Sequence, residues 1–218
     1  MQRILILGAG GHAQVVADIL LRMRDAGAQV EPVGYLDDNP RLRGEERLGL
    51  PILGGVADLP RIPHDALILA IGDNKTRQRL FQQLERQGER FASARHPAAV
   101  IAPDVPIGRG AMICAGVVVN TGSMIGDDVI LNTGCTVDHH NRIGDHTHIA
   151  PGAHLGGDVR VGEGALVGIG ATVMPQRHVG DWSVVGAASL VHRNVPDCSI
   201  VIGVPATSAR SASKRKAT

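Results

Sequence analysis

Histidines are concentrated in one short stretch of this sequence. Five of the ten fall within the sixteen residues from 139 to 154. They are His139, His140, His146, His148 and His154. An imidazole changes its charge near neutral pH, so it is the side chain best suited to moving a proton at physiological pH. Imidazoles also bind Zn²⁺, so metal chemistry is a second interpretation of the same cluster.

The element that carries these histidines has a six-residue repeat. Every sixth residue from 101 to 191 is aliphatic: Ile101, Ile107, Ile113, Val119, Ile125, Leu131, Val137, Ile143, Ile149, Leu155, Val161, Val167, Val173, Val179, Val185 and Val191. A period of six fits neither a helix nor an alternating strand, and it predicts a solenoid of short strands and turns. Small or polar residues usually follow the aliphatic one, as is typical of a turn. We therefore predict an all-β domain that forms a β-helix.

The first ninety residues have a different pattern. An apolar strand at 4–7 runs into Gly8-Ala9-Gly10-Gly11-His12 and then into a helical pattern. A second strand ends in Asp37-Asp38, and a third, at 66–71, ends at Gly72. Strands that alternate with helices indicate a small parallel sheet of the nucleotide-binding type.

The glycine-rich turn has three interpretations. Gly8-x-Gly10-x-x-Ala13 followed by Asp37 fits a dinucleotide fingerprint, but ninety residues provide only one of the two halves of that fold. A half-size domain for one nucleotide fits better, because N–H groups at such a turn attract phosphate. The third interpretation is a tight strand-to-helix turn, and Asp37-Asp38-Asn39-Pro40 is likewise compatible with an ordinary surface turn.

Three motifs ahead of the repeats carry a family resemblance. They are Gly-x-Gly-Gly-His-Ala at 8–13, Tyr-Leu-Asp-Asp at 35–38 and Ala-Ile-Gly-Asp-Asn-Lys-Thr-Arg at 70–77. With the hexapeptide repeats, the chain resembles bacterial nucleotide-sugar acetyltransferases of the NeuD/PglD type from residue 4 to about residue 206. The resemblance implies a Rossmann-like α/β half domain at 1–97 and a left-handed parallel β-helix at 98–206. It also implies acetyl-CoA-dependent transfer to an amino sugar used in surface polysaccharide biosynthesis.

The resemblance assigns roles to individual residues. The sugar nucleotide is expected at Gly10, Gly11, His12 and Gly72, with its base at Asp37 and Asp38. His139 is expected to be the general base. The family commonly has Glu or Asp after that histidine, whereas this chain has His140. A neutral imidazole can also accept a hydrogen bond, so both histidines are candidates for the catalytic site.

The cofactor-binding residues also follow from the resemblance. His148 and Gly157 are expected near the acetyl group, and Ile169 and Ala187 along the pantetheine arm. The Gly157 N–H is a candidate donor to the developing oxyanion, although a glycine there could serve only the turn. The family forms homotrimers with coenzyme A between neighbouring prisms, so we expect a homotrimer with active sites at subunit interfaces.

Composition excludes several classes of function. The formal net charge is +1 and only four residues are aromatic, so neither a nucleic-acid nor a membrane partner is indicated. The three cysteines have no metal or disulfide spacing. No signal peptide is recognisable, so a cytoplasmic location is expected. Residues 207–218 are basic and lack apolar periodicity, which predicts a disordered tail.

Four functions therefore remain open. The first is N-acetylation of a nucleotide-linked 4-amino-4,6-dideoxy sugar with His139 as base and no metal. The second is O-acetylation of a sugar of the sialic acid type. The third is a zinc-dependent, carbonic anhydrase-like hydro-lyase, and the fourth is a non-enzymatic, nucleotide-binding trimer. In the zinc case His148 and His154 are poorly placed, because a spacing of six puts them on different faces of one coil.

Overall fold

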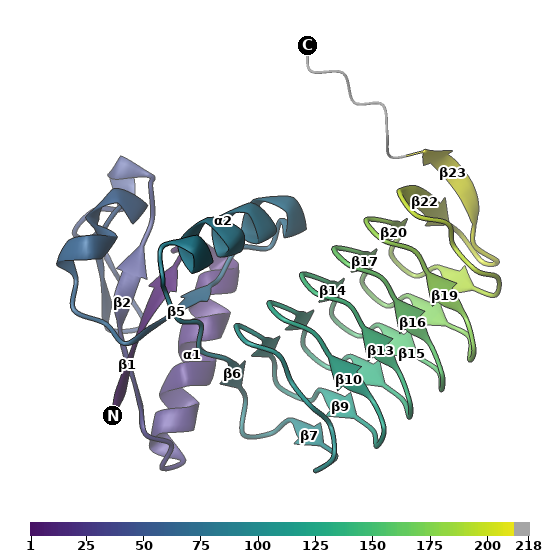
Figure 1. Ribbon diagram of the computed structural model, residues 1–218, viewed down its shortest axis with the longest axis horizontal. Coiled ribbons are helices and arrows are strands. Elements are labelled where there is room, and N and C mark those ends of the chain that lie inside the picture. The colour runs from purple at the N-terminus through teal and green to yellow at the C-terminus, as the bar shows by residue number, and fades with distance from the viewer. Residues whose placement is uncertain (212–218) are drawn as a thin grey trace. The chain divides into compact units, whose positions relative to one another are not determined.

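The computed structural model describes residues 1–211 and divides into two compact units, Met1–Pro97 and a second that begins at Ala98 (Figure 1). The first unit is α/β and the second is a parallel β-helix, as the sequence predicts. Within the described residues, no helix has both the length and the apolar character needed to cross a membrane.

The first unit is built on one mostly parallel sheet. Its strands are β1 (Gln2–Leu7), β2 (Val30–Leu36), β3 (Glu46–Arg47), β4 (Leu50–Gly54) and β5 (Ala66–Leu69), in the order β3-β4-β2-β1-β5, with only β3 antiparallel. The other elements are α1 (Gly11–Asp25), η1 (Pro40–Leu42), η2 (Val56–Arg61), α2 (Asn74–Arg86) and β6 (Ala94–Arg95). β1 pairs with β2 on one side and β5 on the other, so its carboxyl end is the point where a ligand crevice forms in such sheets.

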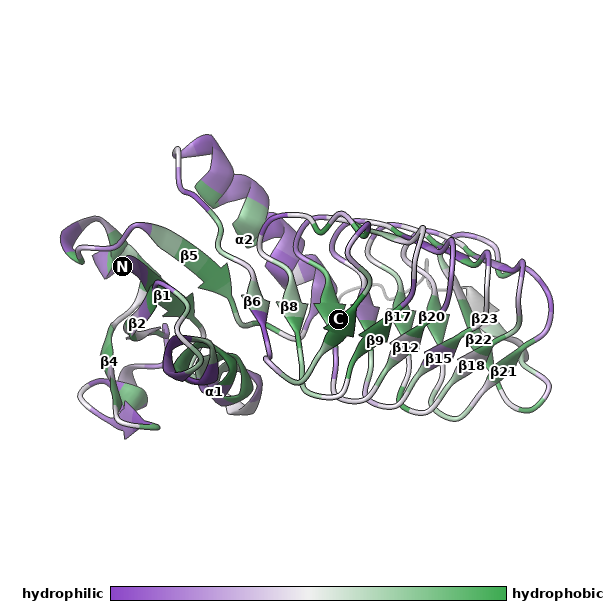
Figure 2. Ribbon diagram, turned by 90° about the horizontal axis from the view of Figure 1, so that it is seen from below, coloured by the Kyte–Doolittle hydropathy of each residue, from purple (hydrophilic) through white to green (hydrophobic). Residues whose placement is uncertain are grey.

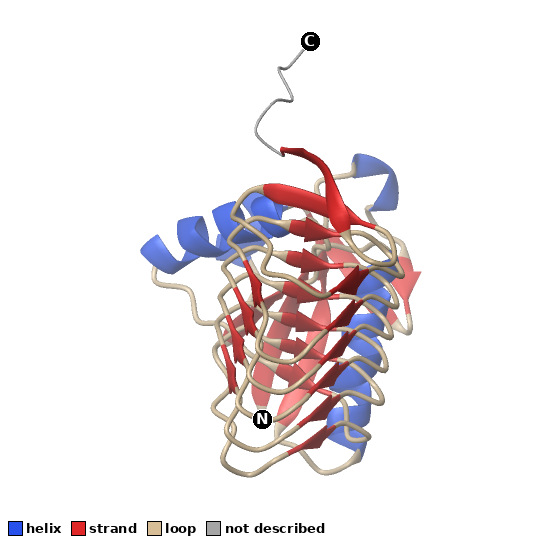
Figure 3. Ribbon diagram, turned by 90° about the vertical axis from the view of Figure 1, so that its right-hand side faces the viewer, coloured by secondary structure: helices blue, strands red, loops and turns tan. Residues whose placement is uncertain are grey.

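The second unit has three faces of stacked short strands, all of two residues except β22 (Figure 3). The β12 face contains β7 (Val100–Ile101), β9 (Val118–Val119), β12 (Thr136–Val137), β15 (His154–Leu155), β18 (Thr172–Val173) and β21 (Leu190–Val191). The β13 face contains β10 (Met124–Ile125), β13 (Arg142–Ile143), β16 (Arg160–Val161) and β19 (His178–Val179). The β14 face contains β8 (Met112–Ile113), β11 (Ile130–Leu131), β14 (His148–Ile149), β17 (Leu166–Val167), β20 (Val184–Val185) and β22 (Ser199–Ile202).

Each strand pairs in register with the strand one coil away. Ile143 pairs with Val161, and Ile149 pairs with Val167, so one coil is 18 residues long, whereas the last pairing, of Val184 with Ile200, spans 16 residues. The repeat aliphatics are buried from Ile113 to Val191, as predicted, and the strands are coloured as hydrophobic in Figure 2. Ile101 and Ile107 are only partly buried.

The turn prediction needs one correction. The left-handed backbone conformation falls three places after each aliphatic residue from Ile107 to Val185, as at Asp128, His140 and His146, and not directly after it. The glycines that directly follow the β13-face strands serve another purpose, because a methyl group on any of them would overlap atoms of the next coil. These are Gly108, Gly126, Gly144, Gly162 and Gly180. Close approach of neighbouring coils therefore selects glycine at this corner.

The predicted disordered tail is wrong at its start. Thr207–Ser211 form β23, which pairs antiparallel with β22. An edge strand leaves N–H and C=O groups unpaired, and the returning chain satisfies them on β22. Backbone pairing of this kind needs no apolar periodicity, so the sequence pattern did not reveal it. The remainder of the predicted tail, 212–218, lies outside the described residues.

A buried asparagine ties together the corner that follows the β12 face. The Asn141 side chain donates to the carbonyls of Asp138 (2.6 Å) and Gly156 (3.0 Å), and accepts from the N–H of Val159 (2.7 Å). Its own N–H donates to Ser123 Oγ in the preceding coil (3.1 Å). One side chain thus satisfies backbone groups of two coils in a dry interior.

Replacing Asn141 with Leu, a side chain of similar volume, should lower the free energy of unfolding by roughly 2–4 kcal/mol, because buried N–H and C=O groups lose their partners. Chemical denaturation followed by circular dichroism measures this loss. Thr172→Ala, on an exposed outward position of β18, is the control and should change stability by less than about 0.5 kcal/mol. Equal stability of the Asn141→Leu variant and the wild type would contradict this account.

Candidate active site

His139 follows β12 at the corner that Asn141 supports, and its side chain is exposed. Its N–H donates to Asp138 Oδ1 (2.9 Å), and Asn120 Nδ2 donates to the same oxygen (2.7 Å). The bond from Asn120 and then that from His139 hold the pKa of Asp138 below its usual range. Asp138 therefore fixes the backbone of the histidine turn.

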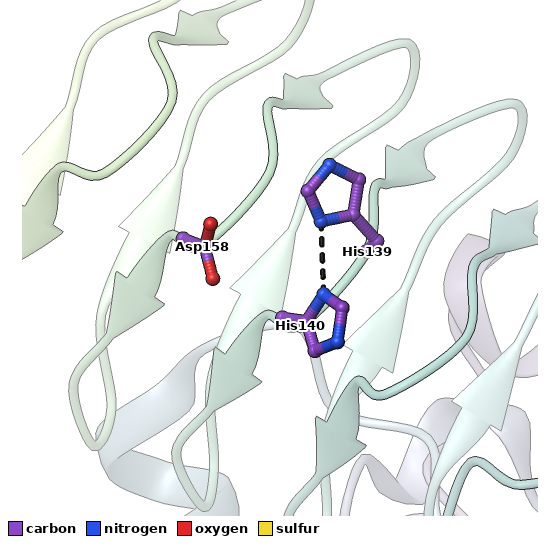
Figure 4. A group of neighbouring side chains, drawn as sticks. All are labelled: His139, His140 and Asp158. Carbon is purple, nitrogen blue, oxygen red and sulfur yellow. Dashed lines mark hydrogen bonds between the residues drawn. The ribbon is translucent and has the colours of Figure 1, made fainter.

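The two adjacent imidazoles are in contact. His139 Nδ1 and His140 Nδ1 lie 3.0 Å apart, with the rings at 78° to one another (Figure 4). One of the two nitrogens must carry a hydrogen and donate the hydrogen bond, and the other must be unprotonated and accept that bond. His140 holds the left-handed conformation, with φ of 59°, which turns its ring back toward His139.

Each imidazole lies against a glycine of a neighbouring coil. A methyl group on Gly157, one coil after His139, would lie 2.5 Å from His139 Nε2. A methyl group on Gly122, one coil before His140, would lie 2.6 Å from His140 Cδ2. The structure thus brings Gly157 and His139 together, and the reason for glycine there is space at the Nε2 edge.

The other three predicted cofactor residues lie elsewhere on the prism. His148 is half-buried on β14, where its Nε2 meets Asn132 Nδ2 (3.1 Å). Ile169 and Ala187 are exposed in the turns after β17 and β20, one coil apart. These turns lead into the β12 face, whereas His139 lies in the turn that follows this face. The two corners are therefore separated by the length of one face along the strand direction, about 15 Å. One chain does not bring His139 together with Ile169 and Ala187.

Zinc ligation fits this arrangement poorly. Among the described residues, one group of three has suitable atom types, and these atoms, from His139, His140 and Asp158, lie within 4.8 Å of one another. Ligand atoms around tetrahedral Zn²⁺ are about 3.3 Å apart. The Nδ1 atoms are already hydrogen-bonded to each other. His148 and His154 lie on different faces, as expected, and His154 Nδ1 bonds to Thr136 Oγ1 (2.9 Å).

A second candidate site lies at the carboxyl end of β1 and β2. A hollow of about 420 Å³ is lined there by Asp37 and Asp38 together with parts of η2 and α2. Asp37 accepts hydrogen bonds from the N–H groups of Ala9 (2.8 Å) and Asn39 (2.9 Å), and Asp38 accepts one from Val56 (2.8 Å). These bonds shape the turns and place both carboxylates at the hollow.

The predicted glycines lie outside the lining of this hollow. A methyl group on Gly10, Gly11 or Gly72 would have nothing within 4 Å, so packing within the protein does not require glycine at these positions. Gly10 is the N-cap residue of α1 and provides no side-chain hydrogen bond, whereas Asp73 caps α2 by accepting from Thr76 N–H (2.8 Å). The uncapped start of α1 retains the N–H groups that suit an anion.

His12 is a neutral imidazole next to a buried cation. Burial, and then the charge of Arg77, lowers the pKa of His12 to about 4. Arg77 is fully buried and donates to the carbonyl of Ile71 (2.9 Å). At neutral pH His12 therefore offers hydrogen bonds without adding a second positive charge.

The helix α2 also lines the hollow, which the sequence motifs did not predict. Thr76, Arg79, Leu80 and Gln83 line it. Their spacing of three, four and seven residues places them on one face of the helix, and that spacing after the Gly72-Asp73 turn was the available signal.

Comparison with known proteins identifies a family and a relative that this chain resembles. Residues 3–84 match the family described as the PglD N-terminal domain. UDP-N-acetylbacillosamine N-acetyltransferase of Bacillus subtilis (strain 168) is 36% identical over 117 residues, which are 53% of this chain and about half (52%) of that protein's length.

Two solved structures match nearly the whole chain. PerB from Caulobacter crescentus, in complex with CoA and GDP-perosamine, is 38% identical with a TM-score of 0.87, and the match covers 96% of this chain and 98% of that one. The acetyltransferase domain of PglB from Neisseria gonorrhoeae FA1090 is 32% identical with a TM-score of 0.87, over 95% and 100% of the two chains. With this identity and coverage, and with the left-handed β-helix expected from the sequence, the chain belongs to the PglD- and PerB-like family of nucleotide-sugar N-acetyltransferases.

Proposed function

We propose that this protein transfers an acetyl group from acetyl-CoA to the amine of a nucleotide-linked 4-amino-4,6-dideoxy sugar. The observation that carries the proposal is the His139 imidazole, held through Nδ1 by His140 with its Nε2 edge at Gly157. Relatives similar over nearly the full chain support it, since one binds CoA and GDP-perosamine and another binds acetyl coenzyme A.

The proposed reaction is direct. The sugar amine attacks the thioester carbonyl, a C–N bond forms, and the C–S bond breaks. His139 Nε2 accepts the amine proton, which then passes to the departing thiolate of coenzyme A. The Gly157 N–H is the proposed donor to the thioester oxygen, a contribution of about 3 kcal/mol in comparable sites. No metal takes part in this scheme.

The separation of the predicted residues supports a shared site. In the same chain, the corner that holds Ile169 and Ala187 is separated from the His139 corner by about the length of one face of the prism. A pantetheine arm on Ile169 and Ala187 would therefore present its thioester to His139 of a neighbouring copy, and a homotrimer is the proposed assembly. His148, on β14, would contact the cofactor near its acetyl end. We place the reaction in the cytoplasm, where acetyl-CoA is available, in a pathway of surface glycan synthesis.

The nucleotide is proposed to bind the first unit. Its phosphates would meet the uncapped start of α1 at Gly10, Gly11 and His12, close to the Gly72 turn. Its base would enter the hollow at Asp37 and Asp38, whose carboxylates accept N–H groups of uracil or guanine.

The direct test measures coenzyme A release from acetyl-CoA with UDP- and GDP-linked 4-amino-4,6-dideoxy sugars and their hydroxyl counterparts. Turnover confined to one amino sugar supports N-acetylation and identifies the nucleotide. Turnover with hydroxyl acceptors alone would replace the proposal with O-acetylation. Absence of turnover in a folded trimer would favour a binding protein.

His139→Asn should lower kcat by roughly 10²- to 10⁴-fold and leave both KM values within about threefold, because the base acts only as the proton moves. Steady-state kinetics with the best acceptor measures this split. His178→Asn, an exposed histidine on β19, is the matched control and should behave as wild type. Full activity of His139→Asn would remove His139 as the base.

Gly11→Ala tests the nucleotide position. The added methyl meets no protein atom within 4 Å, and alanine favours the helix, so stability should be unchanged or higher by about 0.5–1 kcal/mol. The KM for the nucleotide sugar should nevertheless rise about tenfold or more, while that for acetyl-CoA stays constant. An unchanged KM would move the phosphates away from this turn.

A further inference from the structure

Asp104 belongs to the same corner as the two histidines. It occupies the turn after β7, 18 residues before Gly122 and 36 before His140, so the three residues form one column across three coils. Asp104 Oδ2 accepts from Gly122 N–H (2.8 Å) and from Thr121 Oγ1 (2.8 Å). These bonds, followed by the charge of His140, hold the pKa of Asp104 below its usual range.

Gly122 lets the carboxylate and the imidazole approach from opposite sides. A methyl group on Gly122 would lie 2.9 Å from His140 Nε2, so this nitrogen faces the glycine. The N–H of the same glycine is bonded to Asp104. The Nε2 side of His140 thus faces Gly122, across which the charge of His140 acts on Asp104, while its Nδ1 side faces His139.

We propose that His139, His140 and Asp104 form a positioning chain, in which Asp104 fixes the tautomer of His140 and His140 fixes that of the base. The proposal rests on the proposed function, because it concerns the same base. His139 needs an unprotonated Nε2 to accept the amine proton, so its proton must sit on Nδ1 and be donated to His140 Nδ1. His140 then carries its own proton on Nε2, on the side of Gly122.

This chain accounts for the missing acid next to the base. At the position where the family commonly has Glu or Asp, the neutral His140 accepts the hydrogen bond from His139. Asp104 supplies the negative charge, and it acts on His140 and not on His139 directly. Asp104 and His140 are positioning residues, since neither takes the proton of the substrate. Charge stabilisation of the imidazolium formed at His139 is therefore weaker than with an adjacent carboxylate.

Protonation should break the chain. An extra proton on His140 Nδ1 would place two hydrogens in the 3.0 Å gap and release the His139 ring. The charged groups that face this pair are Asp104, Asp138 and Asp158.

The first measurement is imidazole ¹⁵N NMR of the intact protein at neutral pH. We expect the proton of His139 on Nδ1 and that of His140 on Nε2. Asp104→Asn should mix the tautomers of His140, and His140→Gly, which suits the left-handed position, should mix those of His139. The opposite tautomers in the wild type would overturn the proposal, whether or not an acceptor sugar is known.

The second measurement is kinetic. His140→Gly should lower kcat about 10- to 100-fold with both KM values within about threefold. His140→Glu should restore kcat to within about fivefold, and it should move the acid limb of kcat/KM upward by about one pH unit, because an adjacent carboxylate stabilises imidazolium. Asp104→Asn should lower kcat about three- to tenfold and move that limb to lower pH.

Asp181→Asn is the matched control, because Asp181 is also exposed and accepts a turn N–H from a neighbouring coil, that of Glu163 (2.9 Å), but at another corner. It should keep wild-type kinetics. Wild-type kcat and pH profile in both Asp104→Asn and His140→Gly, with His139→Asn inactive, would overturn the positioning chain and leave the proposed function intact. A wild-type protein inactive on every acceptor would refute the function alone, since the tautomers are measured separately.

Discussion

The in-register stacking of 18-residue coils is the constraint on which the rest of this structure depends. Within the stacked coils, a residue lies next to the residues 18 before and 18 after it, as Val137 lies between Val119 and Leu155, so a side chain at a corner has only the room that its two neighbours leave. His139 has room because residue 157 is glycine, and His140 has room because residue 122 is glycine. The candidate active site is therefore specified by residues on three successive coils. On the two outer coils these residues are glycines, which have no side chain.

The same stacking explains how far the sequence predicts the fold. The aliphatic residue at every sixth position predicts the β-helix and its core from Ile113 onward, because a six-residue period places these side chains inside the prism. It does not predict β23, because an edge strand needs only backbone partners. It also misplaces the turn. The glycines after the β13-face strands are needed because the next coil leaves no room for a side chain, and not because of their own backbone conformation.

The candidate site is less predictable for a related reason. Sequence spacing brings Gly157 to His139, since the two are one coil apart, but the family resemblance was needed to choose this histidine among five. Asn141 and Asp104 were missed, because their roles depend on which way a polar side chain turns at a corner. In the first unit, Asp37 and Asp38 line the hollow, and their binding of the base stays a prediction, while the contribution of α2 required the helix to be placed on the sheet.

Strain and hydrogen bonding at the histidine corner are balanced against one another. His140 occupies a left-handed conformation that costs a non-glycine residue roughly 1–2 kcal/mol. Directly after it, the buried Asn141 makes three side-chain hydrogen bonds to backbone groups of its own and the next coil. Each such bond contributes about 1 kcal/mol, so the asparagine offsets the cost of its neighbour. The unfavourable conformation persists because the coil around it is over-determined, and it is this conformation that turns His140 back onto His139.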